Sequence, residues 1–127
     1  MWKDKEPHFG QDYFFKDQAF ASDGKAQVSQ VLGLGETLAG IRVRGWVVGS
    51  AKATSGNTIK TVLKVADAVD AEEWITVAEN TVTANGTTIS GDIFAYIPEA
   101  DKKFMRVEVT NASGVSGAFS VAPELIP

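Results

Sequence analysis

The sequence predicts an all-β, single-domain sandwich or barrel of about eight antiparallel strands, and three observations support this prediction. Several stretches alternate apolar and polar residues, which is the pattern of a strand with one buried face. Turn-forming residues recur roughly every 8 to 12 positions between these stretches. No segment between them has the apolar spacing of an amphipathic helix. A chain of 127 residues is long enough for one domain with its own core.

Residues 1–24 differ in character from the rest, so we predict an N-terminal arm at 1–24 and a sandwich domain at 25–127. The arm holds half of the aromatic residues of the chain and shows no strand or helix period. Because aromatic side chains anchor interfaces, we expect the arm to extend over a neighbouring subunit. The predicted partner-binding residues are Trp2, Phe9, Tyr13, Phe14 and Phe15. The alternative is an arm that folds back as an edge strand, with Phe14, Phe15 and Phe20 packed internally.

Two strands are predicted over 27–34 and 41–50. Gly45 lies in the middle of the second strand, where a glycine indicates a bulge or the close approach of another group. One face of the first strand carries Val28, Gln30 and Leu32. One face of the second carries Arg42, Arg44 and Trp46, opposite Ile41, Val43, Gly45 and Val47.

The second half of the chain is predicted to contain further strands separated by turns. Residues 54–57 form a hairpin-type loop before a return strand, and an acidic connection follows. Asn85-Gly86 is the clearest tight-turn dipeptide. The last third, 102–124, is predicted to be a β-hairpin whose Met105, Val107 and Val109 face the core. The predicted strand segments are 58–66, 74–78 with 81–83, 87–90 and 91–97.

Little in the sequence indicates catalysis or a bound metal, so we expect no enzyme activity and no cofactor. The chain has no cysteine, which excludes disulfides, thiolate metal sites and cysteine catalysis. The only histidine is His8, in the arm, where a Ser-His-Asp site has no framework. We interpret the acidic residues of 67–73 as a solvated loop rather than a glycosidase pair or a calcium site.

Charge and hydropathy narrow the possible partners. A net charge of −4 and a pI near 4.9 make nucleic acid an unexpected partner. No run of about 18 apolar residues predicts a membrane span. The charged start of the chain is not that of a signal peptide. Arg42, Arg44 and Trp46 form either a sugar- or partner-binding stripe or a solvated outer sheet face with a half-buried tryptophan.

The order of the segments resembles that of the jelly-roll capsid cement, or decoration, proteins of tailed bacteriophages. Residues 15–19 and 31–35 resemble the family's entry into a strand with a short glycine loop. Residues 65–78 resemble its succession of strand, acidic loop and strand, and 103–121 resemble its closing hairpin. The resemblance spans roughly 14–123. The arm before Phe14 is longer and more aromatic than a jelly roll requires.

The resemblance implies a jelly-roll-like β-sandwich with an extended arm and a structural role in the virion. Such a protein is made in the host cytoplasm, binds the major capsid protein on the capsid exterior, and stabilises the shell by bridging neighbouring capsid subunits. It also implies self-association, as a homodimer or homotrimer, and no catalytic residues. The alternative is a carbohydrate-binding or adhesion β-sandwich module, with Trp46 and Trp74 as its candidate aromatic residues.

Overall fold

Strand β8 (Phe104–Asn111) lies in the middle of the core because its side chains alternate strictly between the two faces. Met105, Val107 and Val109 have no exposed surface, whereas Arg106 and Glu108 between them are partly exposed. Fully burying an aliphatic side chain of this size stabilises a fold by roughly 1.5–3 kcal/mol. The predicted inward placement of these three residues is confirmed.

The computed structural model describes residues 13–33, 41–97 and 104–125, and the regular elements of this part are all β-strands. Besides β8, they are β1 (Phe15–Ala19), β2 (Gln27–Val28), β3 (Leu32–Gly33), β4 (Ile41–Lys52), β5 (Thr58–Ala66), β6 (Ile75–Thr83), β7 (Thr88–Tyr96) and β9 (Ala118–Leu125).

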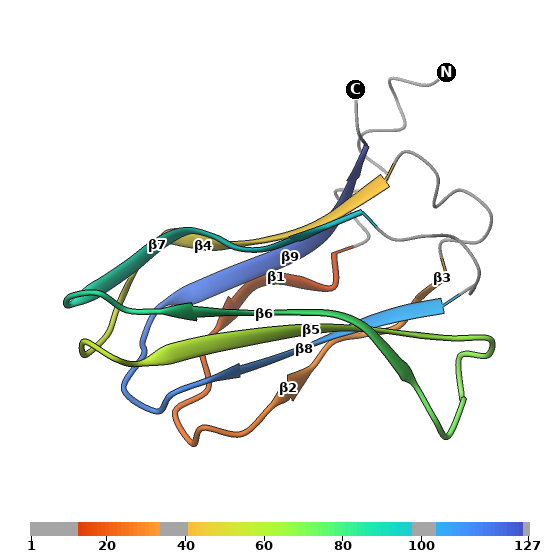
Figure 1. Cartoon of the computed structure of the whole chain (residues 1–127), viewed down its shortest axis with the longest axis horizontal. Helices are drawn as coiled ribbons and strands as arrows, with labels where there is room; N and C mark the ends of the chain where they lie inside the picture. The colour runs from red at the N-terminus through yellow and green to blue at the C-terminus, as the bar shows by residue number, and fades with distance from the viewer. Residues whose placement is uncertain (1–12, 34–40, 98–103, 126–127) are drawn as a thin grey trace.

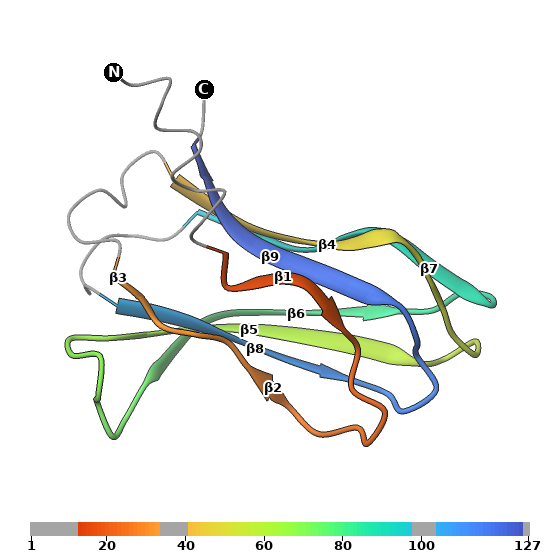
Figure 2. The ribbon, with the colours of Figure 1, turned by 180° about the vertical axis from the view of Figure 1, so that it is seen from behind.

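The strands form two antiparallel sheets packed face to face (Figures 1 and 2). We call the sheet with the order β1-β9-β4-β7 the first sheet, and the sheet with the order β2-β8-β5-β6 the second; β3 also pairs with β8. Strands β4 and β5, β6 and β7, and β8 and β9 follow each other in the chain but lie in opposite sheets. Repeated crossing between two four-position sheets is the jelly-roll arrangement, so the predicted fold class is confirmed.

The pairing predicted for the end of the chain is wrong. β8 pairs with β5, β2 and β3, whereas β9 pairs with β1 and β4, so 102–124 is not a hairpin. The loops at 54–57 and Asn85-Gly86 likewise carry the chain from one sheet to the other. Turn residues specify where a chain reverses but not whether the next strand lies beside the last or in the facing layer.

The true hairpin of the second half joins β5 to β6 through the acidic connection. Its register runs from Thr58 opposite Thr83 to Val65 opposite Ile75. The segments predicted separately over 74–78 and 81–83 therefore belong to one strand. The segments over 87–90 and 91–97 likewise merge into β7.

The predicted boundary at residue 24 is wrong for the described part of the arm, because β1 is an edge strand of the first sheet. Phe15 pairs with Val121, and Ala19 pairs with Ala118. Phe14, Phe15 and Phe20 are 4%, 7% and 7% exposed. The rings of Phe15 and Phe20 each lie 4.9 Å from that of Phe119. Phe14 and Phe15 therefore belong to the core rather than to a partner surface, as in the alternative reading. Trp2, His8 and Phe9 lie outside the described residues.

The strand predicted over 27–34 is interrupted between β2 and β3. Ser29 turns inward, where its N–H donates to the Val107 carbonyl and its hydroxyl accepts from the Val107 N–H, both at 2.8 Å. Val28 is consequently exposed and Leu32 buried, so the prediction that they share a face is wrong. A polar side chain that replaces a ladder partner ends the regular pairing here.

Gly45 has both of the roles that its position indicated. A Cβ at Gly45 would lie 3.2 Å from side-chain atoms of Ile93 and Val121 and 3.3 Å from the Cβ of Phe94. The ladder between β4 and β7 also shifts register directly after Gly45. The missing side chain therefore lets β7 press its apolar residues into the core at this level.

Three of the strands at the sheet edges are irregular. β1 shifts register between Phe15 and Gln18, where Asp17 has a φ of 50°. β6 shifts opposite Leu63 and Lys64, and β7 shifts twice along β4. The remaining edge is the interrupted pair β2 and β3. Bulges of this kind bend and twist a strand locally.

Candidate partner-binding face

Strand β4 presents its charged and aromatic side chains on the outer face of the first sheet. Val43 and Val47 face the core, 0% and 4% exposed, so the residues between them point outward. The structure thus brings together Arg42, Arg44 and Trp46, as the alternation predicted.

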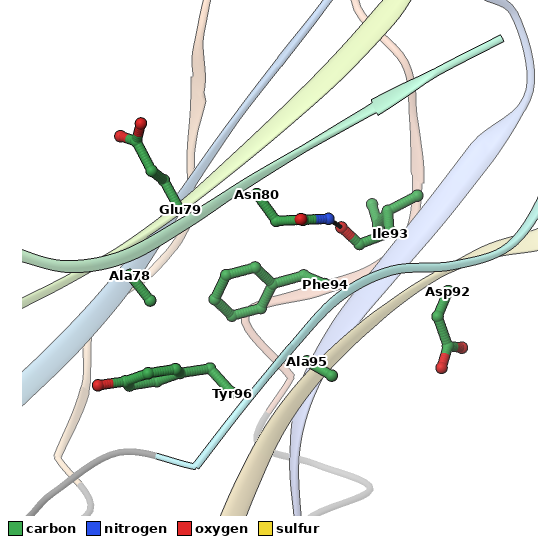
Figure 3. A pocket seen from close by; sticks show the side chains of 8 residues that line it. All are labelled: Ala78, Glu79, Asn80, Asp92, Ile93, Phe94, Ala95 and Tyr96. Carbon is green, nitrogen blue, oxygen red and sulfur yellow. Dashed lines mark hydrogen bonds between the residues drawn. The ribbon is translucent and has the colours of Figure 1, made fainter.

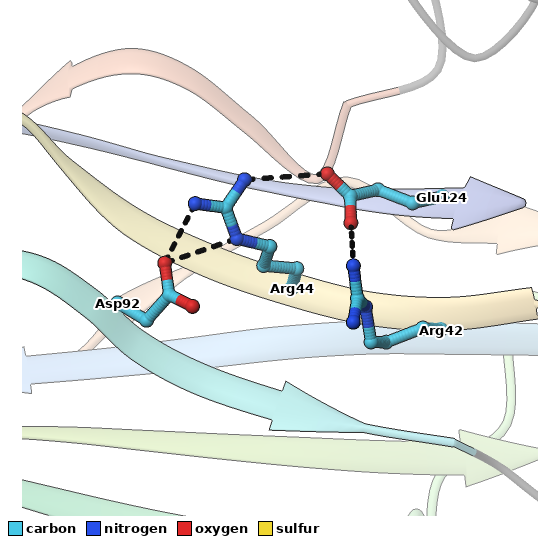
Figure 4. Close-up of polar contacts among 4 residues, drawn as sticks. All are labelled: Arg42, Arg44, Asp92 and Glu124. Atoms are coloured by element: carbon cyan, nitrogen blue, oxygen red, sulfur yellow. Dashed lines mark hydrogen bonds and ion pairs between the residues drawn. The ribbon is translucent and has the colours of Figure 1, made fainter. Parts of the chain in front are cut away.

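Arg44 and Arg42 are held by carboxylates from both neighbouring strands (Figure 4). Arg44 donates to Asp92 of β7 through Nη2 at 2.6 Å and Nε at 3.0 Å. On the other side, its Nη1 donates to Glu124 of β9 at 3.4 Å, and Arg42 Nη2 donates to the second oxygen of Glu124 at 2.9 Å. The network spans three strands and holds both guanidinium groups in place.

Asp92 responds electrostatically to this arrangement. The hydrogen bond from Arg44 and the charge of that guanidinium hold the pKa of the Asp92 carboxyl below its ordinary value, against the opposing effect of partial desolvation. The side chains of Arg44 and Asp92 remain 32% and 54% exposed. Exposed pairs of this kind contribute little to stability, typically below about 1 kcal/mol. The network orders the surface more than it stabilises the fold.

Trp46 is held between two further side chains. The Arg44 guanidinium lies 4.8 Å from the centre of its ring, and the Tyr13 ring meets it edge-on at 6.2 Å. Lys16 Nζ lies 5.6 Å from the Tyr13 ring. Tyr13 is therefore the predicted arm residue that the structure places on this face. We name the outer-face cluster as Tyr13, Arg42, Arg44, Trp46, Asp92 and Glu124.

A second tryptophan–arginine pair lies on the outer face of the other sheet. The Arg106 guanidinium lies 4.7 Å from the ring centre of Trp74, whose Nε1–H donates to the Ala71 carbonyl at 3.0 Å. Glu108 accepts from Arg106 at 3.0 Å and pairs with Lys64 at 3.2 Å. Sequence reasoning named Trp74 but not Arg106, although the alternation of β8 indicated that Arg106 points outward.

A pocket of about 350 Å³ lies between the edge strands β6 and β7 (Figure 3). Figures 1 and 2 show these strands diverging from their shared turn. Asn80 Nδ2 donates to the Ile93 carbonyl at 2.8 Å and so ties the two sheets together beside the pocket. Sequence reasoning missed this pocket, because it depends on the separation of two sheet edges. Its lining consists of Ala78, Glu79, Asn80, Asp92, Ile93, Phe94, Ala95 and Tyr96.

The acidic connection between β5 and β6 lies apart from the outer-face cluster, and Asp67, Asp70, Glu72 and Glu73 are all exposed. Among residues 13–33, 41–97 and 104–125, no three His, Cys, Asp or Glu side chains gather in a way that suits a metal ion. Within the same ranges there is also no helix of the length and hydropathy needed to cross a membrane.

Comparisons with known proteins give no match in sequence: no protein-family model and no curated protein matches the chain. Solved structures do share its architecture at low identity. A CBM4 structure is 15% identical with a TM-score of 0.47, over 89% of this chain and 76% of that one. A chain of infectious bursal disease virus, Gx strain, is 10% identical with a TM-score of 0.44, over 87% and 30%.

A third similar structure is the enzymatically active domain of tailspike protein 4 of bacteriophage CBA120. It is 16% identical with a TM-score of 0.39, over 80% of this chain and 13% of that one. This chain thus spans less than a third of the viral chain and about an eighth of the tailspike chain. We take no function from likenesses at these scores.

Proposed function

We propose that this chain is a structural virion protein, a cement protein of a tailed bacteriophage, that binds the major capsid protein on the capsid exterior. The observation that supports this role most directly is Trp46, held between Tyr13 and Arg44 on an otherwise charged outer sheet face. Tryptophan, tyrosine and arginine are the residue types that dominate the binding energy of protein interfaces. In the proposed complex, the outer-face cluster covers the junction between neighbouring capsid subunits and bridges them.

The physical properties of the cluster suit such docking. Arg44 and Arg42 are already held by Asp92 and Glu124, so little side-chain freedom is lost when a partner binds. The two arginines balance the two carboxylates, and a partner therefore meets a surface with no net charge in this network. Many copies on one shell gain avidity from contacts that are individually modest. The proposal includes synthesis in the host cytoplasm, self-association, and no enzyme activity, cofactor, nucleic acid or membrane partner.

Co-sedimentation with capsids that lack the protein tests this function. Trp46→Ala should weaken capsid binding roughly tenfold or more, as expected for a central interface tryptophan. Trp74→Ala is the matched control, because Trp74 also carries a stacked arginine but lies on the opposite outer face. Equal binding by both variants, or equal loss in both, would show that the outer-face cluster is not the capsid-binding surface.

A carbohydrate-binding or adhesion module is the second candidate function. It is favoured by the partly exposed Trp46 ring, which has hydrogen-bonding charged groups beside it on the same face. An aromatic platform with polar groups near it suits a polar ligand with apolar faces, such as a sugar. Saturable binding on a glycan array that Trp46→Ala abolishes, together with normal capsid binding by the same variant, would favour this function over the first.

A further inference from the structure

The pocket between β6 and β7 suits one aromatic side chain. Its volume of about 350 Å³ is at the lower end of ligand pockets, and two unpaired strand edges open it to the outside. Figure 3 shows the Phe94 ring between the two strands and the Tyr96 ring beside it. Ala78 completes an apolar wall against which another ring can pack.

The rim of the pocket favours a positive charge beside that ring. Glu79 and Asp92 contribute carboxylates to the lining, which contains no Lys or Arg. Asp92 is paired with Arg44, but the nearest cation printed for Glu79 is Lys60 at 3.9 Å, with both side chains about half exposed. A long exposed pair leaves most of the field of Glu79 available to a partner.

The N-terminal segment 1–12 contains the matching chemistry. Trp2 has Lys3 beside it and Lys5 close by in the sequence. A segment of this length can span up to about 40 Å when extended. It ends at Tyr13, whose ring lies against Trp46 on the outer face of the first sheet. To reach the pocket of its own chain, the segment would run from β1 across β9, β4 and β7, over the outer-face cluster.

This inference rests on the proposed function, in which the capsid covers that face and closes this path. We infer that residues 1–12 of one copy bind the β6–β7 pocket of a neighbouring copy, with Trp2 in the pocket and Lys3 or Lys5 near Glu79. The contact joins two different surfaces, so it links copies head to tail and closes into a ring, such as a trimer, where the rotation allows. The Trp–Lys segment is therefore the link between copies, and the outer-face cluster is the link to the shell.

A peptide experiment without capsids tests the inference. The receptor is the full-length chain carrying Trp2→Ala, and the probe is a synthetic peptide of residues 1–12. Saturable binding should shift the backbone amide NMR signals of residues 78–80 and 92–96. The matched control peptide carries Trp2→Ala and should bind roughly tenfold more weakly or worse. Signal changes centred on another surface, or equal binding of the two peptides, would overturn the inference.

Receptor variants locate the site independently. Glu79→Lys should weaken peptide binding, whereas Glu72→Lys, in the exposed connection between β5 and β6, should not. Ala78→Phe should fill the pocket and block the peptide, with Ala26→Phe at an exposed loop position as its control. Because Glu79 is exposed, its variant keeps the test informative even where Ala78→Phe fails to fold. Unchanged binding to Glu79→Lys and to folded Ala78→Phe would contradict the pocket assignment.

Sedimentation of the full chain tests whether the contact joins two copies. The wild type should self-associate at the concentrations where the peptide binds, and Trp2→Ala should reduce this association. A wild type that stays monomeric while the peptide binds would place the segment in its own pocket and overturn the link between copies. The capsid co-sedimentation of Trp46→Ala uses neither the peptide nor the pocket, so failure of the proposed function is read separately.

Discussion

The indole rings of Trp46 and Trp74 lie on opposite outer faces of the sandwich, and each has an arginine guanidinium over it at nearly the same distance. The distance is 4.8 Å for Arg44 over Trp46 and 4.7 Å for Arg106 over Trp74. The two pairs differ in what holds the arginine. Arg44 is held from two neighbouring strands by Asp92 and Glu124, whereas Arg106 shares Glu108 with Lys64. One chain thus contains two similar surface pairs that can be altered one at a time.

Val107→Asp should destabilise the protein by about 4 kcal/mol, because Val107 has no exposed surface and the core offers a carboxylate no partner. Burial raises the pKa of such a carboxyl, so the loss should shrink as the pH falls through that raised value. Thermal unfolding at neutral and acid pH measures both effects. The control is Thr110→Asp, at a partly exposed position on the same strand. An unchanged melting temperature for Val107→Asp at neutral pH would contradict the placement.

Arg44→Gln should raise the pKa of Asp92 towards its ordinary value of 3.8, because Arg44 provides the largest lowering effect through its hydrogen bond. Arg42→Gln should raise it less, since Arg42 contributes only through a weaker charge interaction. In the wild type, the stabilising contribution is present above the ordinary pKa and is lost as the pH falls through the lower folded value. An NMR titration of the Asp92 carboxyl carbon measures these shifts. Equal titration in wild type and Arg44→Gln would show that the pair does not persist in solution.

Gly45→Val should destabilise the protein by about 1–3 kcal/mol, the usual range for overpacking a core. Its added atoms would meet Ile93, Val121 and Phe94, which are all buried. Gly86→Ala is the control, because no atom lies within 4 Å of the added Cβ. Chemical unfolding compares the two, and a Gly45→Val variant as stable as Gly86→Ala would mean that β7 yields readily at this point.

Removing residues 1–12 should leave the melting temperature close to that of the full chain, because β1 and the buried Phe14 and Phe15 stay in place. Phe15→Ala should instead cost about 3–5 kcal/mol through the cavity it leaves beside Phe119. Thermal unfolding of both variants separates the segment before Tyr13 from β1. A truncated chain as unstable as Phe15→Ala would assign residues 1–12 a role in the stability of the domain itself.

The strands were easier to predict than their partners. Alternation identified β4, β5 and the inward face of β8, because each strand carries that signal within a few residues. β1 escaped the same test, since the register shift and the positive φ at Asp17 break the alternation of its aromatic residues. The pairing of β8 and β9 was wrong because turn residues do not record which layer the chain enters next.

The candidate face shows the same division. Arg42, Arg44 and Trp46 could be grouped from one strand, but nothing local identifies the carboxylates that hold them. Asp92 and Glu124 lie 48 and 80 positions from Arg44 in the sequence and reach it only through the sheet order. The pocket was unpredictable for a similar reason, because it arises where β6 and β7 diverge.

The irregular strands at the edges of both sheets affect how the folded chain behaves at high concentration. A straight, unpaired edge offers a row of free N–H and C=O groups on which another chain can add as a strand, and fibrils grow by repeating that step. In this protein, β1, β6 and β7 carry register shifts, and the fourth edge is split into the short β2 and β3. A folded copy therefore offers an incoming chain no continuous ladder to extend, so amyloid growth would have to start from unfolded molecules.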